Sequence, residues 1–349
     1  MELSSHGPWT SSDAPHADVI MSCRARLARN IAGFPFVNRA SEAQLQEIVN
    51  ISRQVLLGNR VADGMFWVDL PHATERDRNL LVERHLISKH HAAAEIKRGV
   101  AISGDETLSV MVNEEDHLRM QILAPGLNLR AVHDRINEVD DAIERAIDYA
   151  FSSRWGFLTV CPTNVGTGIR FSVMMHLPAL KITNEIERVR RAAKDLHLAV
   201  RGYYGEGSES AGDFYQISNQ VTLGRAEEEL RREFEEAILP RIIDYELKAR
   251  RILMERNAAL LDDRAHRALG VLRTARLLGT EEAMKLLSRV RLGAHLGRLP
   301  GANVDLDKVN RLFLQVQPAH LMLHVGRRLS RDELREARAE LVRTTLGSP

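Results

Sequence analysis

The sequence predicts an α+β protein in which a mostly antiparallel sheet, flanked by helices, is followed by an all-helical C-terminal domain. Short apolar runs such as 100–103 and 107–112 flank a Gly104-Asp105 turn, which is typical of a hairpin. Helical periodicity with almost no strand signal follows Arg225. Hydrophobic residues make up 44% of the 349 residues and aromatic residues only 5%, which indicates an aliphatic, helix-rich interior. A chain of this length can bury a full core and form two domains.

Three parts follow from this pattern. Residues 1–17 are rich in Ser, His, Pro and Gly, and we expect a flexible N-terminus. Residues 18–255 contain every expected strand and form the first domain, and residues 256–349 form the helical domain.

The first half of the sheet domain alternates short strands with helices. Ser41 is a helix-capping residue type, and Leu45, Ile48 and Val49 follow it at helical spacing. The same periodicity runs through Val132, Ile136 and their apolar neighbours further along. We expect strands at 19–23, 65–70, 100–103, 107–112 and 120–123, and helices at 41–57, 74–85 and 129–151.

The second half continues with a strand at 169–175, a helix at 180–196, a strand at 198–201, a loop at 202–213 and a strand at 215–219. A long helix at 225–257 should kink or break at Pro240, since proline lacks the N–H that a helix interior needs. Further helices are expected at 258–278, 280–296, 305–316 and 330–345.

Charge and cysteine content limit the class of protein. The 48 basic and 47 acidic residues give a net charge of +1, so nothing global indicates a nucleic-acid or membrane partner, and any cationic site must be local. Cys23 and Cys161 cannot form a disulfide framework, and the sequence shows no signal peptide or long apolar segment. We expect a cytoplasmic protein.

The stretch from Cys161 to Arg170 is a tight loop that leads into a strand. Pro162 and Asn164 are turn residues, and two glycines permit backbone angles that other residues avoid. The glycine spacing matches neither a Walker loop nor a dinucleotide-binding fingerprint. A thiol at the entrance and a guanidinium at the exit point to chemistry that a structural turn would not need.

Five arginines stand at strand or loop positions next to turns: Arg24, Arg26, Arg119, Arg170 and Arg201. Guanidinium groups bind phosphate in a bidentate manner, so arginines gathered on one sheet face would imply a polyanion between them. Two such charges about 4 Å apart repel by about 4 kcal/mol at an effective dielectric of 20, so a cluster needs a ligand or acids to compensate it. The alternative is a set of scattered surface arginines in an arginine-rich chain.

Four blocks resemble the ATP:guanido phosphotransferases, the creatine and arginine kinase family. They are the residues 22–30 (SCRARLARN), 113–119 (NEEDHLR), 161–170 (CPTNVGTGIR) and 201–206 (RGYYGE). The bacterial protein-arginine kinase branch is the more similar one, because the chain starts directly at the first block and because residues 205–209 and 214–220 also resemble it. The fold implied is a phosphagen-kinase catalytic domain, which is glutamine-synthetase-like.

The resemblance implies an ATP site in which Mg²⁺ is held mainly by phosphate oxygens and water, so no protein metal ligands are expected. His85 would contact the nucleotide near its ribose or base, although a histidine at a helix end is often only a cap. The implied nucleotide-binding residues are Ser22, Cys23, Arg24, Ala25, Arg26, His85, Arg119, Arg170, Phe171, Ser172, Val173, Met174, Arg201, Gly202, Tyr203, Tyr204, Gly205 and Glu206.

The implied catalytic residues are Glu115, Glu206 and Cys161. Lowering the pKa of an arginine from about 12.5 to 7 costs roughly 7 kcal/mol, so a base must take its proton as the phosphoryl group is transferred. The resemblance implies that Glu115 is this base and that Glu206 flanks the guanidinium. The alternative for Glu206 is a solvated acid in a loop. Cys161 would act as an orienting thiolate whose pKa is lowered by positive charge, or else is a small buried hydrophobe. Glu114 and Asp116 are expected to be supporting or solvent-facing acids.

The sequence departs from the family at two places. Cys23 stands where the family usually has serine, which would put a second thiol near the nucleotide. In the helical domain, Arg331, Asp332 and Arg335 match a motif that forms an allosteric phosphoarginine pocket in protein-arginine kinases, but Glu336 replaces its final alanine. The alternative is an exposed helix with i, i+3 and i, i+4 ion pairs.

The resemblance thus predicts transfer of the ATP γ-phosphoryl group to arginine side chains of proteins, which would mark them for quality-control degradation. The implied partners are protein substrates with exposed arginines, a second copy of the chain, an activator protein and an AAA+ protease chaperone. Two rival functions stay open: a small-molecule guanidino kinase that acts on free arginine, and a catalytically inactive adaptor that binds phosphoarginine.

Overall fold

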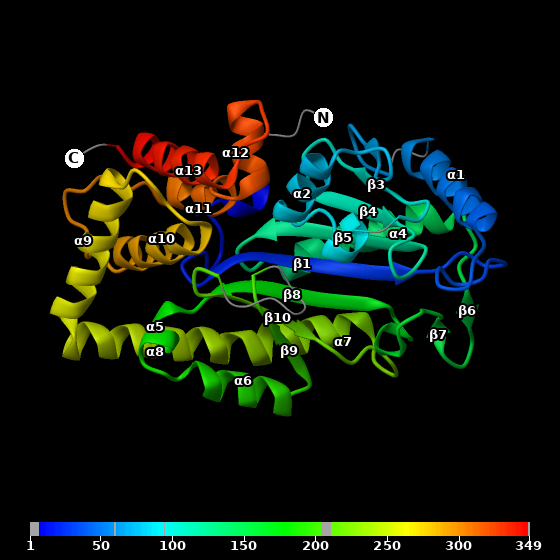
Figure 1. Cartoon of the computed structure of the whole chain (residues 1–349). Helices are drawn as coiled ribbons and strands as arrows, with labels where there is room; N and C mark the ends of the chain where they lie inside the picture. The colour runs from blue at the N-terminus through cyan, green and yellow to red at the C-terminus, as the bar shows by residue number, and fades with distance from the viewer. Residues whose placement is uncertain (1–6, 59–60, 94, 204–210, 348–349) are drawn as a thin grey trace.

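One eight-stranded antiparallel sheet forms the centre of the molecule. The computed structural model describes residues 7–58, 61–93, 95–203 and 211–347. The strand order is β2-β3-β4-β5-β1-β8-β10-β9, and every neighbouring pair is antiparallel, which confirms the predicted sheet. The strands are β1 (Ile20–Arg29), β2 (Phe66–Asp69), β3 (Gly99–Ile102), β4 (Leu108–Val112), β5 (Leu118–Pro125), β8 (Ile169–His176), β9 (Leu198–Arg201) and β10 (Phe214–Asn219). The long strand β1 lies in the middle of the sheet (Figure 1).

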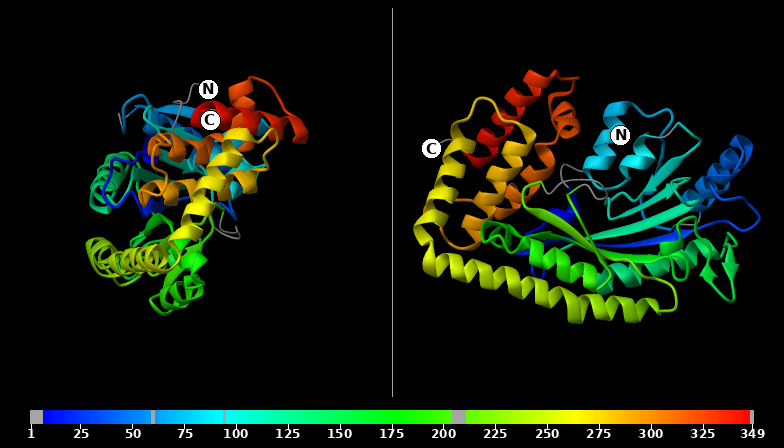
Figure 2. Two further views of the ribbon diagram at one scale, coloured as in Figure 1. Left: turned by 90° about the vertical axis from the view of Figure 1, so that its left-hand side faces the viewer. Right: turned by 60° about the horizontal axis from the view of Figure 1, so that its bottom comes forward.

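One face of this sheet is apolar and covered by helices. Alternate side chains of β1 and β8, including Ala25, Leu27 and Phe171, pack in one core with Val132 and Ile136 of α4 (Leu129–Glu144). Helix α1 (Glu42–Gly58) covers the β2–β4 end, and α8 (Leu239–Arg256) runs along the same core (Figure 2). Since successive side chains of a strand point to opposite faces, the intervening polar residues must lie on the other face.

The polar face is covered only in part. Helices α2 (Glu75–Glu83) and α3 (Lys89–Ala93) pack over β3 and β4 through a small apolar cluster that contains Leu81, Leu86, Val100 and Met111. The C-terminal helices cover the end of the sheet where β1 begins, while the hairpin of β6 (Phe151–Ser152) and β7 (Gly156–Phe157) lies at the opposite end (Figure 1).

The helical domain is built from α9 (Ala258–Thr274), α10 (Thr280–His295), α11 (Leu306–Gln315), α12 (Pro318–Val325) and α13 (Arg331–Leu346). Its core is continuous with the sheet domain, because Met174 and Phe214 join the same apolar cluster as Leu287 and Phe313. Helix α12 was not predicted. Its eight residues are too short and too uniformly apolar to show a clear periodicity, although Pro318 at its first turn is a helix-start signal.

The connection to this domain stays helical through Pro240. Helix α7 (Glu227–Arg232) passes into a π-helical stretch, Glu233–Ile238, and then into α8, with Pro240 in the first turn of α8. The wider π-helical turn before the proline accommodates the missing N–H, so the expected break does not occur.

The structure differs from prediction at three other places. Residues 7–17, expected to be flexible, pack on the fold: the Trp9 side chain is 3% exposed, and Asn310 donates a hydrogen bond to the Thr10 carbonyl (3.1 Å). Helix α4 ends at Glu144, not at 151. The helix predicted at 180–196 is divided into α5 (Pro178–Ile182) and α6 (Ile186–Asp195), because Asn184 adopts a left-handed conformation (φ 59°).

None of the helices in the described part of the chain is long and apolar enough to cross a membrane.

Candidate active site

The five predicted arginines meet on the polar face of the sheet. Arg26 lies opposite Arg170 of β8 on one side and opposite Gln121 of β5 on the other. Arg24 stands two residues before Arg26 on β1, and Arg119 stands two residues before Gln121 on β5. Since alternate residues of a strand point to the same face, both arginines share the face of Arg26. Arg201 lies on β9, three strands from β1, and pairs with Gln216 of the intervening strand β10. The alternative of scattered surface arginines is therefore excluded.

Burial and mutual repulsion both destabilise the charged guanidinium groups on this face. Burial lowers the pKa of Arg24 to about 9, and the charges of Arg119, Arg170 and Arg201 add to this effect. Burial, together with Arg24 and the same three charges, also lowers the pKa of Arg26 well below its ordinary range. The pKa falls because the charged form is destabilised, so this face favours a polyanion.

Of the arginines that the structure describes, Arg26 is the one whose guanidinium most clearly lacks acceptors. Its Nε and Nη2 atoms are buried, and neither has a hydrogen-bond partner among the described residues. Arg24, in contrast, donates weakly to Ser172 Oγ (3.3 Å) and Gln121 Oε1 (3.4 Å). Unsatisfied buried donors of a charged group are costly, and phosphate oxygens are the acceptors that suit them.

The β4–β5 loop brings carboxylates to one end of the arginine face. The turn begins at Asn113, which has a left-handed conformation (φ 58°). Glu114 is buried and accepts hydrogen bonds from Arg119 Nη1 (2.5 Å) and Ser88 Oγ (2.6 Å). Burial raises the pKa of Glu114, but the charge of Arg119 and these hydrogen bonds outweigh it and lower the pKa to about 2. Glu114 therefore fixes Arg119 in the array.

Glu115 has a different environment. Its side chain is 39% exposed, and its Oε2 lies 3.4 Å from Arg119 Nη1. The carboxylate thus stands at the edge of the cationic face and is open to solvent on the other side. A base that takes a proton from an incoming guanidinium needs this kind of position.

Asp116 joins this loop to the Cys161 loop. Its Oδ1 accepts hydrogen bonds from the Val160 N–H (2.8 Å) and from Asn30 Nδ2 (2.7 Å). Asp116 is fully buried, and burial raises its pKa. Asp116 is therefore a supporting acid and does not face solvent. Because it bonds to Val160, it holds the loop that carries Glu115 next to the loop that carries Cys161.

The Cys161 loop is built as a tight passage between strands. Cys161 Sγ lies 3.0 Å from Thr163 Oγ1 and is partly exposed, and Asn164 Oδ1 accepts from Arg170 Nη2 (3.5 Å). Gly168 has φ 71°, and a Cβ there would lie 2.7 Å from the Ala28 carbonyl oxygen. The glycine therefore lets the loop pass close to β1, so that a short segment connects the thiol to the arginine face.

An aromatic group borders the opposite end of the arginine face. The His85 ring lies between Trp9 (5.2 Å between ring centroids) and Tyr203 (5.1 Å), both in edge-on geometry. Burial lowers the pKa of His85 to about 3, with a further contribution from the charge of Arg24, so the ring is neutral near pH 7. Its carbonyl accepts a hydrogen bond from Gln121 Nε2 (2.6 Å). His85 follows the end of α2, but it also belongs to the arginine face.

Several predicted nucleotide residues do not join this site through their side chains. Cys23 and Ala25 point into the core on the other face of the sheet, as do Phe171 and Val173. Cys23 is 1% exposed, and burial raises the pKa of its thiol to about 12. The expected second thiol near the nucleotide is therefore not on the arginine face. Ser22, Ser172 and Met174 alternate onto the polar face, and Gly202 follows Arg201 directly.

The predictions for Tyr204, Gly205 and Glu206 lie outside the described residues.

Two polar residues of the site, Gln121 and Asn164, are not among the predicted site residues. Gln121 stands two positions after Arg119 and therefore on the same strand face, a signal that alternation alone provides. The sequence predicts Asn164 only as a turn residue, but its side chain also contacts Arg170.

The residues predicted to bind phosphoarginine lie in the first turns of α13, in the helical domain. Arg331, Asp332 and Arg335 are all exposed, and Arg335 Nη1 lies 3.8 Å from Asp332 Oδ1. Ser330 and Glu333 cap the start of this helix. Within the described ranges, no group of three or more His, Cys, Asp or Glu residues is arranged to hold a metal ion.

Two family models match the chain. Residues 43–249 match the ATP:guanido phosphotransferase C-terminal catalytic domain, and residues 258–349 match the protein-arginine kinase McsB C-terminal domain.

Relatives with similar sequences span almost the whole chain. A protein-arginine kinase of Symbiobacterium thermophilum is 45% identical over 343 residues, which are 97% of this chain and 96% of the relative. A protein-arginine kinase of Caldanaerobacter subterraneus is 46% identical over 332 residues, covering 94% of this chain and 97% of the relative.

Solved structures with a similar fold are phosphagen kinases. The duplicated taurocyamine kinase of Schistosoma mansoni, with bound transition-state-analogue components, matches with a TM-score of 0.61 and 28% identity, covering 70% of this chain and 34% of its own. Lombricine kinase matches with a TM-score of 0.57 and 24% identity over 71% of each chain, which is a likeness of fold.

Proposed function

The chain belongs to the ATP:guanido phosphotransferase family, and we infer that it is an ATP-dependent protein-arginine kinase. It transfers the γ-phosphoryl group of ATP to a guanidino nitrogen of an arginine side chain in a protein. The observation that carries this is the meeting of five arginines with a half-exposed carboxylate, Glu115, at one end of their array. An adaptor that only binds phosphoarginine has no need for that combination.

The arginine face would hold the ATP phosphates. Two Arg26 nitrogens lack a hydrogen-bond partner within the described part of the chain, and the pKa values of Arg24 and Arg26 are lowered; both observations support a polyphosphate ligand there. Mg²⁺ bound to the phosphates would neutralise part of the charge that develops during transfer. His85 and Tyr203 border this face, and the His85 ring would contact the ribose or base of the nucleotide.

The acceptor guanidinium would enter at the other end, beside Glu115 and Cys161. Glu115 would take the proton as the nitrogen attacks, and Arg119, fixed by Glu114, would stabilise charge on the transferred group. Cys161 would orient the guanidinium electrostatically and would not form a covalent intermediate. Glu206 remains a proposed second carboxylate on the basis of the family resemblance.

Acceptor choice separates the proposed function from its rivals. Unfolded protein and free arginine, each supplied with radiolabelled ATP, should give acid-labile label in the protein only. Label in free arginine but not in protein would indicate a small-molecule kinase. No label in either acceptor, together with binding of phosphoarginine, would indicate an inactive adaptor.

The partners and the cellular role are part of the proposal. A cytoplasmic quality-control kinase would act with a second copy of the chain, an activator protein and an AAA+ protease chaperone. The exposed side chains of Leu277, Leu323 and Val325 in the helical domain offer apolar surface for such contacts. Arg331, Asp332 and Arg335 are proposed to bind phosphoarginine, which is testable by titration with the free compound and an Arg335→Ala variant.

A further inference from the structure

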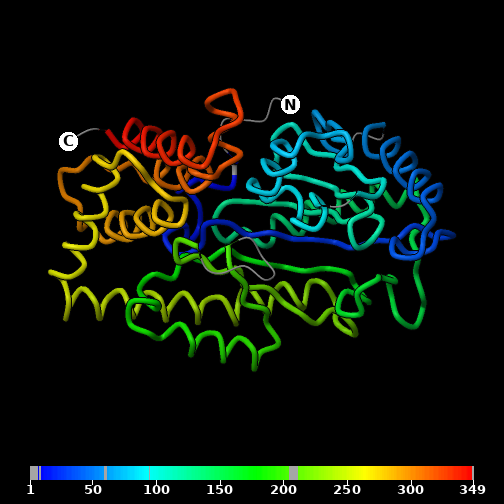
Figure 3. The backbone as a smooth tube through the Cα atoms, viewed as in Figure 1, coloured from blue at the N-terminus to red at the C-terminus, as the bar shows by residue number. Residues whose placement is uncertain are grey.

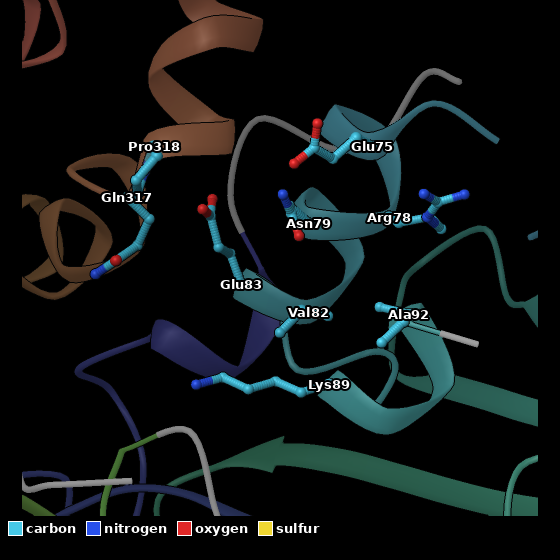
Figure 4. A pocket seen from close by; sticks show the side chains of 10 residues that line it. Glu75, Arg78, Asn79, Val82, Glu83, Lys89, Ala92, Gln317 and Pro318 are labelled. Atoms are coloured by element: carbon cyan, nitrogen blue, oxygen red, sulfur yellow. The ribbon is translucent and has the colours of Figure 1, made fainter. Parts of the chain in front are cut away.

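The end of helix α2 caps the start of helix α12 in the C-terminal domain. The Glu83 carboxylate accepts hydrogen bonds from the backbone N–H groups of Ala319 (2.9 Å) and His320 (3.0 Å). Figure 4 shows the Glu83 side chain reaching toward the first turn of α12, beside Pro318. Since the first N–H groups of a helix have no partner within it, this carboxylate satisfies two of them and complements the helix dipole.

The His320 side chain contacts both Glu83 and the residue that follows it, Arg84. Its Nδ1 lies 2.8 Å from Glu83 Oε2, and its Nε2 lies 3.2 Å from Arg84 Nε. A guanidinium only donates, so Nε2 accepts and the hydrogen lies on Nδ1, which donates to Glu83. Arg84 in turn donates to both oxygens of Glu106 (2.8 and 2.6 Å). All four side chains are buried, so the imidazole has one orientation that satisfies its neighbours.

The segment held in this way leads directly to the arginine face. His85 follows Arg84 in a left-handed conformation (φ 59°), and its carbonyl accepts from Gln121 Nε2 (2.6 Å). The other end of the same amide accepts from Arg24 Nη1 (3.4 Å). A displacement of residues 83–85 would therefore move both the His85 ring and the amide that supports Arg24.

We propose that His320 is a positioning residue for nucleotide binding, through which the helical domain completes the ATP site of the sheet domain. It does not touch the nucleotide. It fixes residues 83–85, and these fix the His85 ring and, through Gln121, the Arg24 guanidinium. This inference rests on the proposed nucleotide site, and it adds to that site a residue of the other domain.

The test is an equilibrium titration of the full chain with MgATP, without any acceptor. His320→Ala should raise the ATP dissociation constant about fivefold, because one to two hydrogen bonds of about 1 kcal/mol are lost behind the site. The kcat at saturating ATP should stay within about twofold of the parent, so the loss appears as a KM effect. His324→Ala, which changes an exposed histidine of the same helix, is the matched control and should bind ATP as the parent does.

Conservative variants separate positioning from stability. His320→Asn retains a donor near Nδ1 and should recover part of the affinity through Glu83, and it also serves if His320→Ala fails to fold. An unchanged ATP dissociation constant in both variants, even with a lower melting temperature, would overturn the inference. Parent protein that binds no ATP, or Arg24→Ala that binds it normally, would instead overturn the proposed nucleotide site itself.

Discussion

The carboxylate of Asp116 accepts a hydrogen bond from the backbone N–H of Val160 (2.8 Å), and the residues next to these two are Glu115 and Cys161. This hydrogen bond therefore helps to set the spacing between the proposed base and the proposed orienting thiol. The two loops come from segments more than 40 residues apart, as the hydrogen bond spans 44 positions.

Removal of this anchor should reduce both stability and turnover. Asp116→Ala leaves the Val160 N–H without its acceptor and removes one of the two acceptors of Asn30 Nδ2, which should cost about 2 to 4 kcal/mol of unfolding free energy. We expect kcat to fall about 10-fold or more, because a small misplacement of catalytic groups has effects of that size. Asp116→Asn keeps an oxygen at the Oδ1 position and should retain most of the activity. Equal kcat losses in the two variants would contradict a positioning role.

Arg26 should lower the stability of the protein without ligand and should strengthen the binding of ATP. Arg26→Met removes one charge from the repelling set together with two nitrogens that have no hydrogen-bond partner among the described residues. We therefore expect the melting temperature without ligand to rise by about 1 to 2 °C, which corresponds to about 1 kcal/mol for a chain of this length. The rise in melting temperature that saturating MgATP causes in the parent should be lost.

Differential scanning fluorimetry with and without MgATP measures both effects. Arg53→Met, which changes an exposed arginine of α1, is the control. An Arg26→Met protein that is still stabilised by ATP as strongly as the parent would argue against phosphate binding on this face.

The Glu114–Arg119 pair should contribute stability that depends on pH. The pKa of Glu114 falls from an ordinary 4.5 to about 2 in the folded protein, so the unfolded state binds more protons between these values. The contribution is therefore fully present above about pH 4.5 and is lost as the pH falls through about 2. Urea unfolding of the parent and of Glu114→Gln at about pH 6, 4 and 3 should show a difference that narrows with acidification. A constant difference would mean that this carboxylate does not titrate as the ion pair requires.

The two cysteines should differ in reactivity. Cys161 is partly exposed, whereas Cys23 is buried under α4 with the pKa of its thiol raised to about 12. Brief alkylation of the native protein, followed by peptide mass spectrometry, should label Cys161 only, and both should react after unfolding. Cys161→Ser should lower kcat, and full activity in that variant would refute an electrostatic role for the thiol.

Much of the sheet and of the arginine face could be predicted from the sequence, because both depend on local alternation. Arg24 and Arg26 stand two residues apart on one strand, so their common face follows from strand geometry. Their neighbours across the sheet, Arg119 and Arg170, depend on strand order, which the family resemblance supplied and periodicity did not. The same alternation places Cys23 and Phe171 in the core. The family resemblance covers continuous blocks of sequence and does not distinguish the two faces of a strand. The predicted site therefore included Cys23 and Phe171, whose side chains lie in the core.

The remaining features depend on contacts between distant segments. Trp9 lies in a stretch of turn-forming residues, and contacts with distant segments, among them the His85 ring and Asn310, hold this stretch in place. Glu83 and His320 are 237 positions apart, and nothing in the sequence around either residue predicts that they pair. Local sequence gives no signal for such a pair, so the contact between Glu83 and α12, on which the proposed role of His320 rests, could be found only in the structure.

The most direct measurement of the central claim is mass spectrometry at neutral pH of an unfolded protein acceptor incubated with the enzyme, ATP and Mg²⁺. Neutral conditions matter because phosphoarginine is acid-labile. We predict phosphate on arginine residues of the acceptor, and a loss of about 100-fold or more with Glu115→Gln, which removes the base but leaves the arginine face intact. Glu138→Gln, at an exposed glutamate of α4, should act like the parent. Phosphate on residues other than arginine, or undiminished transfer by Glu115→Gln, would contradict the account.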